Sequence, residues 1–136
     1  MNLNLNNANV VYYENYVEHS LSDRLFNSIV DTIRNENNKT VEINNNTRTL
    51  NRKTMVYVNS DIGDFVTPKI WGMDITVLNF TPDLLILKAK IEKSVGYEFN
   101  ICLVNYYLTG KNNIGWHSDN EEKGDIECIA SVSLGT

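Results

Sequence analysis

The segment from Thr81 to Tyr107 limits the possible folds most, because it predicts a helix and a strand in direct succession. Thr81 can cap the helix, Pro82 stands at the favoured first position, and Gly96 can end it. One apolar stripe would join Leu84, Leu87, Ile91 and Val95. The stretch YEFNICLVNYY that follows is typical of a strand. A chain with these neighbours must pack a helix against a sheet.

The other elements predict the same class. An apolar repeat of four residues from Leu21 to Ile33 indicates a helix that begins at Ser20, which has capping-box spacing to Asp23. A strand is expected around 54–58, and residues 35–46 and 59–80 are expected to be a polar connection and an irregular region. The alternating stretch IECIASVSLG (126–135) predicts a last strand. We therefore expect an α+β fold whose helices pack on the sheet.

Length and composition bound the organisation. The 136 residues suit a single domain over 1–136, with residues 1–15 poorly ordered. No apolar run approaches the ~20 residues that a membrane span needs. Two cysteines without a pattern predict core thiols in a reducing, intracellular setting. The net charge of −5 argues against a protein that coats nucleic acid, although Arg48, Arg52 and Lys53 form a local basic cluster.

The strand at 97–107 would place polar side chains at its end. Phe99, Ile101, Leu103, Asn105 and Tyr107 share one face of a period-two ladder. That face changes from apolar to polar, as happens where a barrel or sandwich opens into a site. Asn105 and Tyr107 could instead simply end an edge strand.

A second polar group lies in the stretch IGWHSDNEE (114–122). On an extended segment His117 and Asp119 point the same way and could reach one ion. Imidazole and carboxylate suit borderline metals, and two histidines with one carboxylate hold non-haem Fe(II) in oxygenases. A bare H-x-D pair also occurs by chance, and a solvated turn is the alternative.

These motifs occur together in one order and spacing. Between residues 98 and 135 the chain has N-x-Y at Asn105 and Tyr107, then Gly110, the H-x-D pair followed by Glu121, and SVSLG at 131–135. This arrangement closely resembles the core of the AlkB-like family of Fe(II)/2-oxoglutarate-dependent dioxygenases. Upstream, NRKTMVYVN (51–59) resembles the family's nucleotide-recognition segment, with Asn51 where proline is usual. Trp71 falls near the aromatic residue that stacks on a flipped base, but it could equally be a core aromatic.

The resemblance implies a double-stranded β-helix (jelly-roll) core braced by two helices. His117 and Asp119 would be iron ligands and catalytic, and Asn105 and Tyr107 would bind 2-oxoglutarate. Contacts to nucleic acid would come from Arg52, Lys53, Tyr57, Trp71 and Glu121. The cofactors would be Fe(II), 2-oxoglutarate and dioxygen. The reaction would be oxidative demethylation in DNA or RNA alkylation repair by a monomer that binds no membrane, with base flipping for access.

The sequence lacks parts of the family pattern. No histidine follows Asp119, and the arginines that bind the far carboxylate of 2-oxoglutarate are absent. We therefore expect the 136 residues to be an inactive piece of a longer oxygenase, with a jelly-roll incomplete at its C-terminus. The alternatives are an oxygenase that acts on a protein or small molecule, and a non-catalytic nucleic-acid-binding module. The basic cluster could also be a solvated face.

Overall fold

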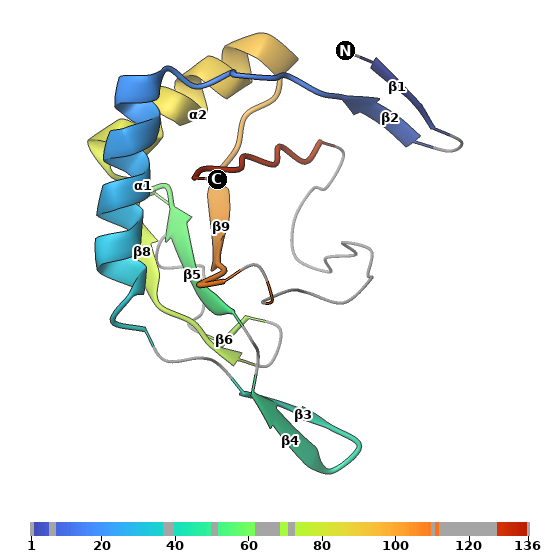
Figure 1. Ribbon diagram of the computed structural model, residues 1–136, viewed down its shortest axis with the longest axis vertical. Helices are drawn as coiled ribbons and strands as arrows, with labels where there is room; N and C mark the ends of the chain where they lie inside the picture. The colour runs from blue at the N-terminus through green and yellow to red at the C-terminus, as the bar shows by residue number, and fades with distance from the viewer. Residues whose placement is uncertain are drawn as a thin grey trace.

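The computed structural model describes residues 2–5, 8–36, 40–49, 52–61, 69–70, 73–109, 111 and 128–135. Their arrangement is drawn in Figure 1. In chain order the elements are β1 (Asn2–Leu5), β2 (Ala8–Val11), α1 (His19–Ile33), β3 (Thr40–Ile43), β4 (Asn46–Thr49), β5 (Lys53–Val58), β6 (Lys69–Ile70), β7 (Met73–Asp74), β8 (Val77–Asn79), α2 (Pro82–Val95) and β9 (Ile101–Tyr106).

A mixed three-stranded sheet in the order β8-β5-β9 forms the centre. Strand β5 pairs in parallel with β8 and in antiparallel with β9. The antiparallel register sets Thr54 opposite Asn105 and Tyr57 opposite Cys102. Because successive side chains of a strand alternate between the two faces, Thr54 and Asn105 lie on one face of the sheet, and Tyr57 and Cys102 lie on the other.

One face of this sheet packs against both helices, which lie on the same side of it in Figure 1. Met55 and Tyr57 of β5 are 0% and 2% exposed there. The helix residues of the same buried cluster are Leu21, Leu25, Ile33, Leu84 and Leu87. Burying a large apolar side chain contributes about 1.5–3 kcal/mol, so this cluster holds the helices on the sheet. The predicted α+β class, with two helices on a sheet, is confirmed at this level.

Helix α2 has the ends that the sequence predicts. The Thr81 side chain accepts a hydrogen bond from the Leu84 amide at 3.3 Å, and Pro82 opens the helix. Gly96 ends it in the left-handed conformation with φ of 77°. The Glu92 carboxylate then accepts a hydrogen bond from the Phe99 amide at 2.7 Å, which ties the helix to the segment before β9.

The predicted start of α1 is wrong. The helix begins at His19 with Glu18 as its N-cap, and no side chain caps it. Ser20 therefore lies inside the first turn and cannot close a capping box with Asp23. The apolar repeat is right: Leu21, Leu25 and Ile33 are buried and Ile29 packs beside them.

Two regions expected to lack regular structure contain strands. Strands β3 and β4 form a hairpin whose turn residues Asn44 and Asn45 have φ of 51° and 64°. Asparagine tolerates this left-handed geometry better than most residues. Within the expected irregular region 59–80, β8 pairs with β5 at Val56 to Val58. A parallel partner so short has little signal of its own in the sequence.

The last predicted strand is not present in the described residues 128–135, which have no strand pairing. They cross near the start of β9 and end beside α1 (Figure 1). Leu134 packs against the core cluster. Gly135, with φ of 79°, lies so close to Phe26 that a Cβ there would meet a ring atom at 2.7 Å. Alternation alone predicts a strand, but a strand also needs a partner.

The N-terminal strands β1 and β2 form a hairpin that pairs only with itself among the described strands. The poor order expected for residues 1–15 stays a prediction. The chain is then fastened to α2 at Tyr16, whose hydroxyl donates to the Lys90 carbonyl at 2.9 Å. Lys90 in turn donates to the Tyr16 carbonyl and lies 4.3 Å from its ring centre. No helix in the described part of the chain is long and apolar enough to cross a membrane.

Candidate functional site

Asn105 is held by two side chains from β5 and the residue before it. The Nε of Arg52 donates to the Asn105 side-chain oxygen at 3.1 Å. The Thr54 hydroxyl donates to the same oxygen at 3.2 Å. Thr54 is directly opposite Asn105 in the sheet and only 2% exposed. The three residues form a cluster that we call the Asn105 cluster, on the sheet face turned away from the helices.

Tyr107 follows the last residue of β9 and is 39% exposed. It lies two residues after Asn105, so the chain brings both predicted cosubstrate residues to the same end of the sheet. The side chains of the Asn105 cluster combine a guanidinium, a hydroxyl and an amide. These groups donate hydrogen bonds or carry positive charge, which suits an anionic ligand rather than a cation.

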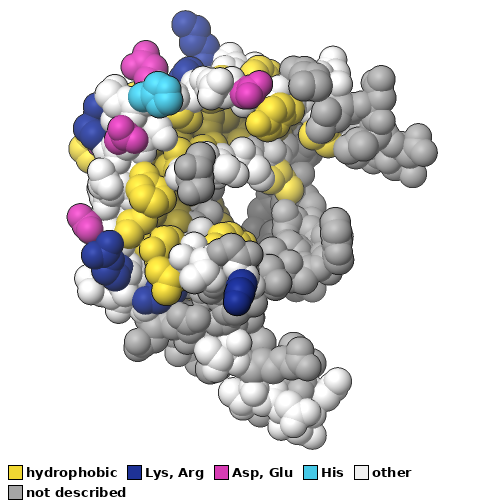
Figure 2. Space-filling model, viewed as in Figure 1, with side chains coloured by type: hydrophobic (Ala, Val, Ile, Leu, Met, Phe, Trp, Pro, Cys, Tyr) yellow, Lys and Arg dark blue, Asp and Glu magenta, His cyan; other side chains and the backbone are white. Residues whose placement is uncertain are grey.

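A further basic group lies at this end of the sheet, on its helix side. Lys53 donates through Nζ to the carbonyl oxygen of Arg34 at 2.8 Å. Arg34 is the C-cap of α1 and is exposed. A cation is favoured at a helix C-terminus, where the helix dipole is negative. In Figure 2 dark blue side chains lie over the lower part of the described surface, at the end where β5 begins.

Tyr57 occupies a different environment from the other predicted nucleic-acid contacts. It is 2% exposed and belongs to the core cluster between the sheet and the helices. Burial raises the pKa of its hydroxyl, and a hydrogen bond with Thr32 opposes this increase. The odd-numbered residues of β5 face the helices, which places this ring in the core rather than on an accessible surface.

Four of the predicted site residues lie outside the described residues: His117, Asp119, Glu121 and Trp71. Within the described ranges no three His, Cys, Asp or Glu side chains gather that could hold a metal ion. The imidazole and carboxylate of the His117–Asp119 pair fit Fe(II) by their donor chemistry.

Thr54 and Arg34 were not among the site residues predicted from the sequence. Thr54 stands in a stretch singled out for other residues, and its part depends on the register between β5 and β9. That register joins positions 51 residues apart, which a single sequence does not specify. Arg34 had one usable signal, because a basic residue after an apolar helical repeat is typical of a helix C-terminus.

Comparison with known proteins identifies the family of the chain. The family model described as the 2OG-Fe(II) oxygenase superfamily matches residues 9–136. Uncharacterized protein R406 of Acanthamoeba polyphaga mimivirus is 29% identical over 122 residues, which cover 89% of this chain and 62% of that protein.

Two mammalian relatives are more similar over a shorter stretch. The alpha-ketoglutarate-dependent dioxygenase alkB homolog 3 of Rattus norvegicus is 41% identical over 58 residues, or 42% of this chain and 20% of that protein. Its counterpart in Bos taurus is 46% identical over 55 residues, or 40% of this chain and 19% of that protein. The chain thus spans less than two thirds of each of these relatives. Since the family model covers most of its length, the chain belongs to the 2OG-Fe(II) oxygenase superfamily and is an AlkB-like member of it.

Proposed function

We propose that the protein is an Fe(II)/2-oxoglutarate-dependent dioxygenase that removes alkyl groups from bases in DNA or RNA. The observation that carries the proposal is the superfamily match over residues 9–136, a range that includes both the N-x-Y and the H-x-D motif. The superfamily implies Fe(II), 2-oxoglutarate and dioxygen. When bound, these would supply the oxidation that hydroxylates an N-alkyl carbon; its bond to the base nitrogen then breaks, which releases an aldehyde and leaves the unmodified base in the strand.

In this proposal two residues bind the metal and two bind the cosubstrate. His117 and Asp119 are two of the iron ligands. Asn105 and Tyr107 donate hydrogen bonds to 2-oxoglutarate, and the donor chemistry of the Asn105 cluster supports this. The sheet β8-β5-β9 would be part of a jelly-roll that the whole domain 1–136 contributes to.

The nucleic-acid contacts are proposed at the same end of the sheet. Lys53 and Arg34 lie beside each other and can meet phosphates, which are the main source of affinity for nucleic acids. Trp71 and Glu121 would lie near the flipped base. Tyr57 has no part in this surface because its ring is in the core.

The test is repair of a single-stranded DNA or RNA oligonucleotide that carries one N-methylated base. We expect the full-length protein to restore the unmodified base and release formaldehyde when Fe(II), 2-oxoglutarate and dioxygen are present. His117→Ala should abolish this, and His19→Ala, a histidine exposed at the start of α1, should not. Turnover of 2-oxoglutarate that no methylated DNA or RNA stimulates would instead support an oxygenase for proteins or small molecules. Binding of nucleic acid without any turnover would support a non-catalytic module.

A further inference from the structure

The Asn105 side chain has a defined orientation because of what faces it. A guanidinium can only donate hydrogen bonds, so the atom that meets Arg52 Nε at 3.1 Å must be the amide oxygen. The Thr54 hydroxyl donates to the same oxygen at 3.2 Å. A carbonyl oxygen has two lone pairs, and these two donors occupy both.

The other end of the amide is therefore the end offered to a ligand. Its NH₂ group makes no hydrogen bond to another described residue, and an NH₂ group can only donate. An asparagine without these anchors could turn its oxygen toward a carboxylate and repel it. Anchoring removes that orientation, and the nearby positive charge of Arg52 polarises the amide so that its N–H groups donate more strongly.

The rigidity of the anchor supports the same reading. Thr54 is 2% exposed, in the central strand of the sheet and directly opposite Asn105. Its β-branched side chain has few rotamers, so its hydroxyl stays in place. Valine would have the same shape without the donor.

We propose that Thr54 and Arg52 are positioning residues that hold the Asn105 amide with its NH₂ group toward 2-oxoglutarate. This rests on the proposed function, in which Asn105 binds the cosubstrate. It reassigns Arg52 from nucleic-acid contact to the cosubstrate site. Neither residue touches the cosubstrate in this account, and both act through Asn105.

The test is the affinity for 2-oxoglutarate in a double-mutant cycle, measured by calorimetry on the full-length protein with Mn(II) in place of Fe(II). Thr54→Val should weaken binding about three- to tenfold, the range for one lost hydrogen bond. Thr54→Ser should restore it. In an Asn105→Ala background Thr54→Val should have no further effect, because the group that it positions is gone.

Arg52→Met gives a second, independent variant that keeps the side-chain length and removes the donor. It should weaken binding in the wild-type protein and much less in the Asn105→Ala background. Thr76→Val is the matched control, since Thr76 precedes β8 on the other side of β5 and its hydroxyl donates to Glu36 at 2.6 Å. It should leave the affinity unchanged. Thermal unfolding of each variant reports whether it has folded.

The outcomes separate this inference from the proposed function. If Asn105→Ala weakens binding and Thr54→Val and Arg52→Met do not, the positioning role is wrong and the proposed cosubstrate site stands. If Thr54→Val weakens binding equally in both backgrounds, its effect is structural and the positioning role is again wrong. If Asn105→Ala itself leaves binding unchanged, both are wrong.

Discussion

At the scale of single residues, alternate positions of β9 meet two environments. Cys102, Val104 and Tyr106 pack against the helix-side core. Ile101 and Leu103, on the opposite face, are 47% and 42% exposed, and Asn105 is on that face too. The sequence predicted that Asn105 and Tyr107 end this strand together. It could not predict that Arg52 and Thr54 anchor Asn105, because that depends on pairing between strands distant in sequence.

Cys102 lies on the helix side of β9, so its thiol should react more slowly than an exposed thiol. Burial raises its pKa to about 11. At pH 8 only about one thiol in a thousand would then be ionised. We expect Cys102, measured in a Cys128→Ala variant, to react with a disulfide reagent at least about tenfold more slowly in the folded protein than in denaturant.

The raised pKa also predicts how the rate of that reaction changes with pH. The rate in the folded protein should keep rising up to about pH 11, whereas the rate in denaturant should level off above about pH 9, past the ordinary thiol pKa. Equal rates in both conditions would contradict burial of this side chain.

Tyr107 allows a test of the other face. If its hydroxyl donates to the cosubstrate, Tyr107→Phe should raise the apparent KM for 2-oxoglutarate. One hydrogen bond to a charged acceptor contributes about 1.5–3 kcal/mol, which corresponds to roughly ten- to a hundredfold. Tyr97→Phe, a change of an exposed tyrosine before β9, is the control and should have no effect. An unchanged KM in Tyr107→Phe would remove this residue from the site.

At the scale of elements, prediction succeeded where the signals are local. Helix α2 was specified by its cap, its proline and its glycine, which act within one turn of each end. The start of α1 was wrong because Ser20 offered a capping pattern that the backbone does not use. Strand β8 was missed and the strand at 126–135 was not found in its described part, since both outcomes depend on a distant partner.

Gly96 allows a test of whether its left-handed backbone conformation stabilises the end of α2. Its φ is 77°, and a Cβ there would meet nothing within 4 Å. Gly96→Ala should therefore be strained without any clash, and we expect a loss of about 1 kcal/mol in the free energy of unfolding. Gly96→Asn should lose less, because asparagine tolerates this conformation. Denaturant unfolding measures both, and equal stability of Gly96→Ala and the native protein would contradict the left-handed cap.

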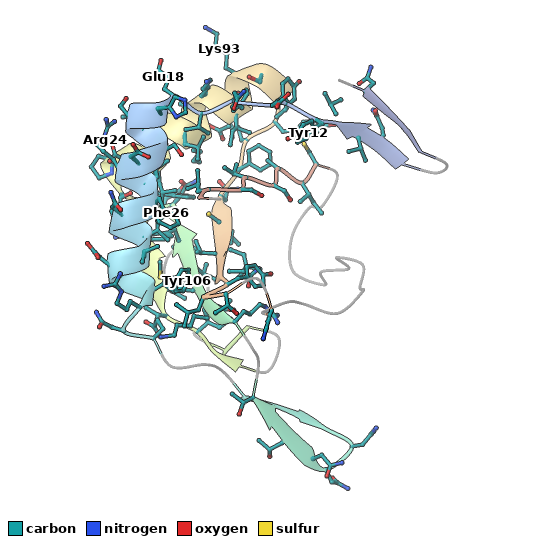
Figure 3. The ribbon with its side chains drawn as sticks, viewed as in Figure 1. Tyr12, Glu18, Arg24, Phe26, Lys93 and Tyr106 are labelled. Atoms are coloured by element: carbon teal, nitrogen blue, oxygen red, sulfur yellow. The ribbon has the colours of Figure 1, made fainter. Side chains whose placement is uncertain are left out.

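At the scale of the whole molecule, charge is the main constraint on the substrate. The net charge of −5 opposes general attraction to nucleic acid. We therefore expect any contact to phosphates to be local, and we propose Lys53 and Arg34 for it, at the end of the sheet where β5 begins. Lys93 lies at the top of the molecule in Figure 3, well away from Tyr106, the residue that pairs with Lys53.

Because Lys93 lies away from Lys53 and Arg34, it can serve as the control for a test of phosphate binding. If Lys53 and Arg34 meet phosphates, alanine at either position should weaken binding to all sequences alike. Each should also reduce the slope of log K against log salt by ~0.7–0.9. Lys93→Ala should leave the slope unchanged. The same slope in all three variants would show that the basic pair is only a solvated surface.

The central claim is iron- and 2-oxoglutarate-dependent oxidation, and conversion of 2-oxoglutarate to succinate tests it most directly. The full-length protein should produce succinate with Fe(II), ascorbate and a methylated oligonucleotide, because the superfamily match covers residues 9–136. His117→Ala and Asp119→Ala should each abolish succinate formation, since each would remove a proposed iron ligand. His19→Ala should leave it intact. Succinate formation that survives His117→Ala, or its absence from the native protein loaded with Fe(II), would contradict the account.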